Sequence, residues 1–449
     1  MIRRIGYIVA FALGVLVGAC RGAPSDEVRA AVKDLANNVP QSQWASTRYL
    51  SLANVPEAER KAHVGVANYV LNSLGQSGKI VRAIEVGDLL RIDLYGLRID
   101  AKDYEPLAVD DPYYHVQTLF AGADGKPTKG FTVGPWIQKE RYYQLRLMTG
   151  SDAGILRSDW FIAKAFAPPH YYRIAKVPEK LSDFYLSLGL DAKEQLELQA
   201  HKGASIFDSG VTRKPRRISR WQGPRIAWVT YDSREDGDIL KHPIRVPNFS
   251  FKHDASEHIA AKANGLHLYA LYDGNGKRQD EVPPDIAHDS SAGNGNDQRL
   301  RAGMSCIRCH TDGGLKPFDN DFAKMLGSGK ADLHLPADEA EYIAAFNDVE
   351  RTLKLLTRDK EDFDLAVARA TDGMDGKALS KAFAEVYAKY EYDRIDEDTV
   401  KRDLGVDSLD ALKSTTDPIV LAVMSKIRVT RKDWEASYGS AALLATQPK

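Results

Sequence analysis

Two of the three cysteines in this 449-residue chain lie within one five-residue window, Cys306-Ile307-Arg308-Cys309-His310, and the third is Cys20. So few cysteines exclude a small fold built on disulfides. Hydrophobic residues make up 43% and charged residues 27% of the chain, a balance that excludes a disordered chain and a polytopic membrane protein. The formal net charge of −1 provides no overall positive field, and we expect no nucleic acid partner.

The window 306–310 has the order and spacing by which c-type haem is attached to protein. On a helical turn, the thiols of Cys306 and Cys309 can each bond one vinyl group of the same haem, and His310 supplies the proximal nitrogen. A structural zinc site needs four ligands, and no cysteine remains in the body of the chain to complete one. A thioredoxin-like redox pair is expected in a βαβ setting, which the surrounding sequence does not show. We therefore predict one covalent haem c.

The sixth iron ligand is open among three alternatives. Met374, in the loop-like stretch 372–376, is the methionine that we expect to bind the iron. A histidine of the preceding region, such as His253, His258 or His288, is the second alternative. The third is an open or water-bound site. A methionine would raise the reduction potential, whereas an open site would suit catalysis.

The N-terminus carries the features of an export signal. Arg3 and Arg4 precede an apolar run from Ile8 to Val17, which is too short for an ordinary membrane-spanning helix. The run ends in Val17-Gly18-Ala19-Cys20, and small residues directly before a cysteine resemble a bacterial lipoprotein signal. That resemblance implies cleavage after residue 19, acylation of Cys20 and a lipid anchor on the periplasmic side of the cell envelope. Because residue 21 is Arg and not Asp, we prefer the outer membrane.

The body of the chain predicts an α+β fold in two parts. We expect a tether over residues 20–45, an α+β domain over 46–300 and a mainly helical haem domain over 301–449. In the first part, the apolar spacing predicts a helix over 57–75 and another over 182–200, with strands over 89–94, 226–231 and 266–272. The second part predicts helices over 337–358, 361–370, 377–391, 397–413 and 417–427.

Two polar segments have a functional and a structural interpretation. Residues 212–225 hold six basic residues and no acidic one, which could form a docking surface for an acidic redox partner or for lipid headgroups. We expect a solvated loop there instead. The segment His253-Asp254-Ala255-Ser256-Glu257-His258 does not place its histidines on one helix face, and we expect a loop with exposed histidines.

Several short segments along the mature chain resemble a largely uncharacterised family of exported bacterial monohaem c-type cytochromes, of the planctomycete and myxobacterial type. The matching segments, in chain order, are Arg48-Tyr49-Leu50-Ser51-Leu52, Leu71-Asn72-Ser73-Leu74, Leu90-Arg91-Ile92-Asp93-Leu94, Ser158-Asp159-Trp160-Phe161, Pro168-Pro169-His170-Tyr171-Tyr172, Phe251-Lys252-His253-Asp254, Asn264-Gly265-Leu266 and Gly303-Met304-Ser305-Cys306. This chain has Ala255-Ser256 where the family has two glycines. The resemblance implies haem c in an exported protein and no particular substrate.

Two classes of function fit these features. The first is an electron-transfer lipoprotein in which a redox partner protein docks near the exposed haem edge. The second is a haem enzyme of the peroxidase or oxygenase kind, with an open distal site lined by His115, Tyr113, Tyr114 and His170. The size of the chain is an argument against a simple carrier, because a monohaem carrier needs only about 100 residues.

Overall fold

The computed structural model confirms an α+β fold. It describes residues 24–121, 127–191, 202–206, 216–233, 252–284, 286–289, 298–311, 315 and 349–445. The N-terminal signal with Cys20 and most of the segment that follows the haem motif lie outside the described residues.

A four-stranded sheet forms the centre of the N-terminal half. Its order is β2-β3-β1-β6, with β1 antiparallel to β3 and parallel to β6. The strands are β1 (Thr47–Ser51), β2 (Ile84–Val86), β3 (Leu89–Asp93) and β6 (Ile155–Arg157). All five residues of β1 are buried, because helices pack on this central strand. Two of these helices are α1 (Pro24–Asn38) and α7 (Ser158–Ala165), and α2 (Glu57–Leu74) packs on α7.

Much of the expected tether forms a packed helix. Helix α1 (Pro24–Asn38) places Val28, Ala31, Val32 and Leu35 on one face, the spacing of an amphipathic helix. These side chains are buried in the core of the N-terminal half. The described chain is therefore part of the folded body from residue 24.

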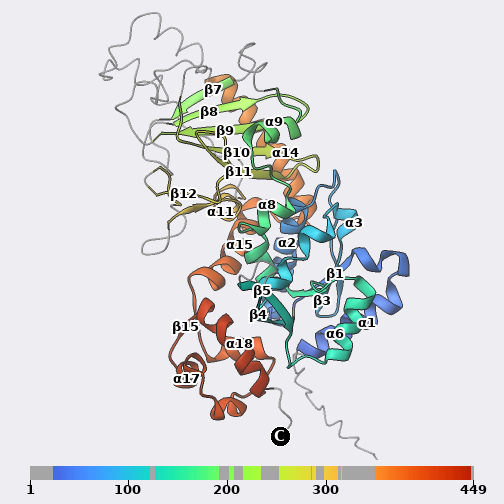
Figure 1. Cartoon of the computed structure of the whole chain (residues 1–449). Helices are drawn as coiled ribbons and strands as arrows, with labels where there is room; N and C mark the ends of the chain where they lie inside the picture. The colour runs from blue at the N-terminus through green and yellow to red at the C-terminus, as the bar shows by residue number, and fades with distance from the viewer. Residues whose placement is uncertain are drawn as a thin grey trace, which may run out of the picture.

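A five-stranded antiparallel sheet lies at the opposite end of the molecule from the C-terminal helices (Figure 1). Its order is β11-β10-β9-β8-β7. The strands are β7 (Lys202–Ile206), β8 (Arg216–Trp221), β9 (Ala227–Asp232), β10 (Ala255–Ala261) and β11 (His267–Asp273). One face of the sheet packs on α9 (Leu181–Ser187) through Phe184 and Tyr185. The other face packs on α14 (Val349–Ala370) and α11 (Met304–His310).

Within the basic segment 212–225, residues 216–221 form a buried strand and not the solvated loop that we expected. Arg216, Arg217 and Arg220 lie in β8 and are buried. Arg216 Nε donates to Asp232 Oδ1 at 2.6 Å, and Arg220 Nε donates to Asp359 Oδ2 at 2.8 Å. Buried guanidinium groups require such partners. These charges therefore hold the sheet together and are not available to the docking surface that was the alternative. Among the described basic residues of the segment, Arg225 is exposed, in the turn after β8.

Helices dominate the C-terminal third, as predicted. Beyond α14 they are α15 (Gly376–Glu391), α16 (Glu397–Leu404), α17 (Pro418–Met424) and α18 (Arg431–Ala445), with a 3-10 turn at Asp410–Ser414. Three of them begin at an aspartate N-cap: Asp375, Asp396 and Asp417. The carboxylates accept hydrogen bonds from the otherwise unpaired backbone N–H groups of the first turn. Helix α14 runs through residues 359–360, where two separate helices were expected.

The hydrophobic core continues across residue 300, where the domain boundary was expected. Leu50 of β1, Tyr269 of β11, Val386 of α15 and Trp434 of α18 belong to the same buried cluster. Helix α15 packs on both α2 and α7. Segments before and after the haem motif therefore share their packing, so the haem motif lies inside one continuous core.

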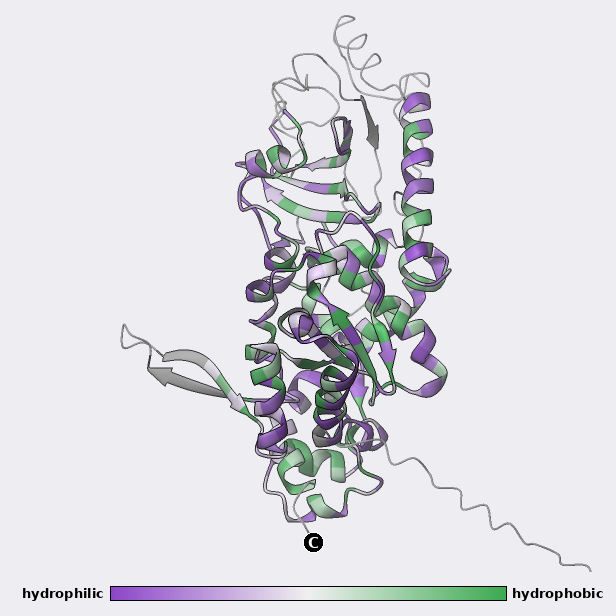
Figure 2. Cartoon of the chain, turned by 90° about the vertical axis from the view of Figure 1, so that its right-hand side faces the viewer, coloured by the Kyte–Doolittle hydropathy of each residue, from purple (hydrophilic) through white to green (hydrophobic). Residues whose placement is uncertain are grey.

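Shorter elements complete the described fold. The remaining helices are α3 (Leu94–Leu97), α4 (Ala101–Tyr104), α5 (Leu107–Asp110), α6 (Lys139–Thr149), α8 (His170–Ile174) and a 3-10 turn at Gln41–Ser46. The remaining strands are β4 (His115–Ala121), β5 (Pro127–Val133), β12 (Glu281–Val282), β13 (Leu300–Arg301), β14 (Arg394–Ile395) and β15 (Val429–Thr430). The β4–β5 hairpin projects from the body (Figure 2). Among the described helices, none has the length and apolarity needed to span a membrane.

Candidate functional site

The haem motif forms the short helix α11, and its three chemical groups share one face. Cys306, Cys309 and His310 stand at positions i, i+3 and i+4 of this helix, and residues with this spacing lie on the same side of a helix. All three side chains are partly accessible. Met304 and Ile307 lie on another side and are buried, which fixes the helix in the core.

The turn before α11 is closely packed. Gly303, the N-cap residue, has a φ of 74°. A Cβ at this position would lie 2.6 Å from the backbone oxygen of Phe166 and 2.9 Å from the ring of Tyr171. Glycine is therefore required here on both conformational and steric grounds. This contact brings helix α8, which carries Tyr171, against the start of the haem motif.

Arg308 attaches α11 to the helix behind it. Its Nη1 donates to the hydroxyl of Tyr392 at 2.8 Å, and its Nη2 donates to the carboxylate of Asp289. The guanidinium carbon also lies 4.3 Å from the centre of the Tyr387 ring. Arg308 is two residues after Cys306, so its side chain leaves the helix away from the cysteine face. Arg308, together with the buried Met304 and Ile307, thus fixes the helix that carries the cysteine face.

Strand β11 supplies the residues that neighbour His310. The Tyr269 ring stacks on the His310 ring, with centroids 6.1 Å apart and an interplanar angle of 26°. His267, on the same face of the strand, stacks on Phe363 of α14 at 3.9 Å. Tyr171 ties this strand to α8, because its hydroxyl accepts from Tyr269 N at 2.8 Å and donates to Tyr269 O at 3.0 Å.

Burial is the main cause of the pKa shifts of His267 and Cys306. It lowers the pKa of His267 to about 3, with a smaller contribution from His310, so His267 is neutral at neutral pH. The Nδ1 atom of His267 is buried and has no hydrogen-bond partner among the described residues. Burial also raises the pKa of the Cys306 thiol well above its ordinary value. The site combines a neutral imidazole, protonated thiol and aromatic rings, which is an apolar setting.

The residues present fit a covalently attached haem. Two thiols and an imidazole lie on one face of a helix, as the attachment chemistry requires. The surroundings are aromatic and largely buried, as an apolar macrocycle requires, and the orphaned Nδ1 of His267 lies in the same region. Cys306, Cys309 and His310 are therefore the residues that would hold it.

The structure places the expected sixth ligands in different surroundings. Met374 lies in the turn between α14 and α15, and its sulfur packs against Gly65 of α2. His258 lies in β10 opposite Ala270, so it points to the sheet face that α9 covers, away from the Tyr269 face. It is 1% exposed, which makes the expectation of an exposed loop histidine wrong. His288 forms an isolated bridge with Arg299.

The residues expected around an open distal site have other partners. His115 contacts Asp111 and Tyr142 through its two ring nitrogens, at 3.0 and 2.5 Å. Tyr114 donates to the carboxylate of Glu27, and His170 contacts Asp110 at 2.9 Å. Tyr113 lies under the Arg157 guanidinium at 3.8 Å. These contacts belong to the packing of the N-terminal half.

Three residues near His310 were missed in the sequence. They are Tyr269, His267 and Tyr171. Residues 266–272 alternate in a way that predicts a strand, and His267 and Tyr269 share one of its faces. That alternation was the available signal, but it does not indicate which helix the face meets.

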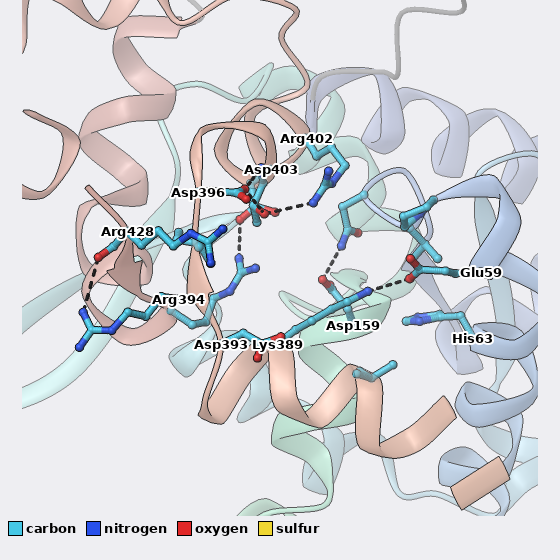
Figure 3. A pocket seen from close by; sticks show the side chains of 17 residues that line it. Glu59, His63, Asp159, Lys389, Asp393, Arg394, Asp396, Arg402, Asp403 and Arg428 are labelled. Atoms are coloured by element: carbon cyan, nitrogen blue, oxygen red, sulfur yellow. Dashed lines mark hydrogen bonds and ion pairs between the residues drawn. The ribbon is translucent and has the colours of Figure 1, made fainter. Parts of the chain in front are cut away.

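A polar cavity of about 470 Å³, separate from the haem motif, lies between α2, α15 and α16. Figure 3 shows His63, Asp159, Lys389 and Arg402 around it. Its wall holds as many acidic as basic side chains, and they pair: Lys389 with Glu59 at 2.7 Å, and Arg431 with Asp403 at 2.5 Å. Burial lowers the pKa of His63 to about 4. These two ion pairs join α15 to α2 and α18 to α16, and the formal charges of the wall balance.

Comparisons of the chain with models of known protein families, with curated proteins and with solved structures found no match. The functional argument therefore depends on the residues themselves.

Proposed function

We propose that this protein is a monohaem c-type cytochrome that transfers electrons in the cell envelope, in keeping with its resemblance to exported cytochromes of this kind. The observation that carries the proposal is the common face of Cys306, Cys309 and His310 on α11, beside the aromatic face of β11. Bound there, haem supplies a one-electron iron centre. The chain attaches the ring through two thioether bonds and binds the iron through His310.

The surrounding residues favour a carrier. Tyr269 stacks on the His310 ring and restricts its orientation, and the Arg308 contacts immobilise the helix that bears all three groups. A fixed ligand geometry suits electron transfer, because little rearrangement then accompanies a change of charge. The partly accessible cysteine face is where a redox partner protein would approach.

The anchor is part of the same proposal. Cys20 would carry lipid after removal of residues 1–19, which places the protein on the periplasmic side of the envelope, with the outer membrane preferred. Met374 remains our candidate for the sixth ligand. All three cysteines then have a covalent partner, so the mature protein holds no titratable thiol and no disulfide.

Expression with haem c maturation tests the proposal. We expect one haem per chain that survives denaturation and reduces and reoxidises reversibly. A C306S/C309S variant should lose covalent haem. The matched C20S variant should keep the haem and leave the membrane fraction. A chain without covalent haem, or with haem that cannot be reduced and reoxidised, would contradict the proposal.

The spectrum separates a carrier from an enzyme with an open site. We expect a low-spin ferric protein that does not bind cyanide. Met374→Ala should convert it to a form that does, whereas Met424→Ala, in α17, should have no such effect. Cyanide binding by the unmodified protein would favour the enzyme.

A further inference from the structure

A cavity of about 760 Å³ is lined by α14, by residues 78–80, by the start of β9 and by the turn that joins β10 to β11. Its volume is in the range of small-molecule sites. Cys306, Cys309 and His310 are not among its described wall residues, but His267 is. The cavity is therefore a neighbour of the candidate haem site and not part of it.

Buried contacts hold the walls of this cavity in place. Asp359 of α14 accepts hydrogen bonds from Arg220 Nε at 2.8 Å and from Trp228 Nε1 at 2.9 Å. The side chains of Arg220 and Asp359 are each 6% exposed. Phe363, also in α14, stacks on His267 of β11, with ring centroids 3.9 Å apart. Because charged groups this deeply buried move only at a high energetic cost, the cavity has a fixed shape.

The described part of the rim is positively charged. Lys79, Arg225 and Arg358 are exposed there, and none of them makes an ion pair with a described acidic residue. Arg220 neutralises Asp359, which leaves Asp362 as the other acidic side chain of the described wall. Several cations around one concave site produce a local field that attracts an anion.

Lys262 adds a buried amine beside this rim. Its ammonium donates to the backbone oxygens of Ser73, Gly75 and Asn72 at the end of α2. These carbonyls carry the negative end of the helix dipole. Burial, together with nearby Arg225, lowers the pKa of Lys262 to about 7. An anion in the cavity would favour the charged form of this lysine.

Part of the wall is apolar. Trp228 is buried, and its indole nitrogen donates to Asp359. Ile259, Ile80 and Leu365 also line the cavity. An inorganic ion would leave this apolar surface and most of the volume to water. A ligand that matches the site therefore combines an anionic group with an apolar body.

We propose that this cavity binds a small organic carboxylate. The carboxylate forms ion pairs with Arg225 and Arg358 at the rim, and the apolar body packs against Trp228 and Ile259. The inference does not depend on the haem. A chain that lacks haem and still binds the carboxylate would contradict the proposed function and leave this inference intact.

Isothermal titration of the full mature chain with benzoate tests the proposal, and neutral benzamide is the comparison. The two ligands have the same ring and differ in charge. We expect benzoate to bind at one site per chain, and benzamide to bind about tenfold more weakly or worse because it forms no ion pair. Equal binding of the two, or no saturable binding of benzoate, would overturn the proposal.

A double variant locates the site. R225Q/R358Q replaces two exposed arginines, so we expect an unchanged thermal unfolding midpoint and about tenfold weaker benzoate binding. The control is K381Q, which removes an exposed cation of α15 outside the cavity and should leave binding unchanged. Unchanged binding by the double variant would also overturn the proposal.

Discussion

Gly265 lies in the turn between β10 and β11, where the five-stranded sheet contacts α14 too closely for a side chain. Its φ is +89°, and a Cβ there would lie 2.8 Å from the Cβ of Ala366. We predict that Gly265→Ala destabilises the protein by about 2 to 4 kcal/mol, because it combines backbone strain with overpacking. Urea denaturation followed by circular dichroism measures this cost.

Gly87 provides the matched control. Its φ is +60°, but a Cβ there would meet nothing within 4 Å. We therefore expect Gly87→Ala to cost only about 1 kcal/mol, from strain alone. Equal costs for the two variants would show that the approach of Ala366 is not tight.

At the scale of elements, Arg308 connects α11 to the C-terminal end of α15 through Tyr392 and Tyr387. The Asp289 side chain is fully buried beside it. Arg308→Leu would remove this cation from the buried carboxylate, and breaking a buried pair in this way costs about 3 to 5 kcal/mol. We expect a loss of that size in the free energy of unfolding.

An exposed ion pair in the same region is the control. Arg299 and Glu281 lie 3.0 Å apart with side chains more than 40% exposed. Arg299→Leu should cost less than about 1 kcal/mol. The double variant R308L/D289N should recover part of the loss, since it also removes the negative charge that Arg308 balanced; no recovery would show that packing of Arg308 dominates.

Elements with a strong local pattern could be predicted from the sequence. The helix expected over 57–75 is α2, the strand over 89–94 is β3, and the helix over 377–391 is α15. The apolar spacing within each segment matches the face that the structure buries. The haem assignment stays a prediction; its signal lies within five consecutive positions, and their placement on one face of a helix follows from that spacing.

Features that depend on distant partners could not be predicted. Arg220 pairs with Asp359, 139 positions further along the chain, so its cluster of basic neighbours resembled a solvated surface. His258 looked exposed because its segment is polar, yet rings from α9 and β11 surround it. The approach of β11 to α11 is likewise a tertiary contact, and so Tyr269 was missed.

At the scale of the whole molecule, buried histidines make stability depend on pH. Burial lowers the pKa of His258 from 6.5 to about 3, since the rings of Phe184, Tyr185 and Tyr272 surround it. Between these values the unfolded chain binds a proton that the folded chain does not, so stability falls as the pH falls. His63, His253 and His267 have lowered pKa values for the same main reason and act in the same direction.

Glu27 acts in the opposite direction. Burial raises its pKa from 4.5 to about 7. Between these values the folded chain holds a proton that the unfolded chain has lost. Glu27 therefore favours folding increasingly as the pH falls from about 7 toward 4.5.

Two variants separate these contributions. The free energy of unfolding is measured by urea denaturation at about pH 6 and pH 5. His258→Phe should reduce its dependence on pH by roughly 1 kcal/mol per pH unit, and Glu27→Gln should increase it by a similar amount. Opposite changes are expected because one group is a base buried neutral and the other an acid buried neutral. If both variants changed the slope in the same direction, or not at all, burial would not control these two protons.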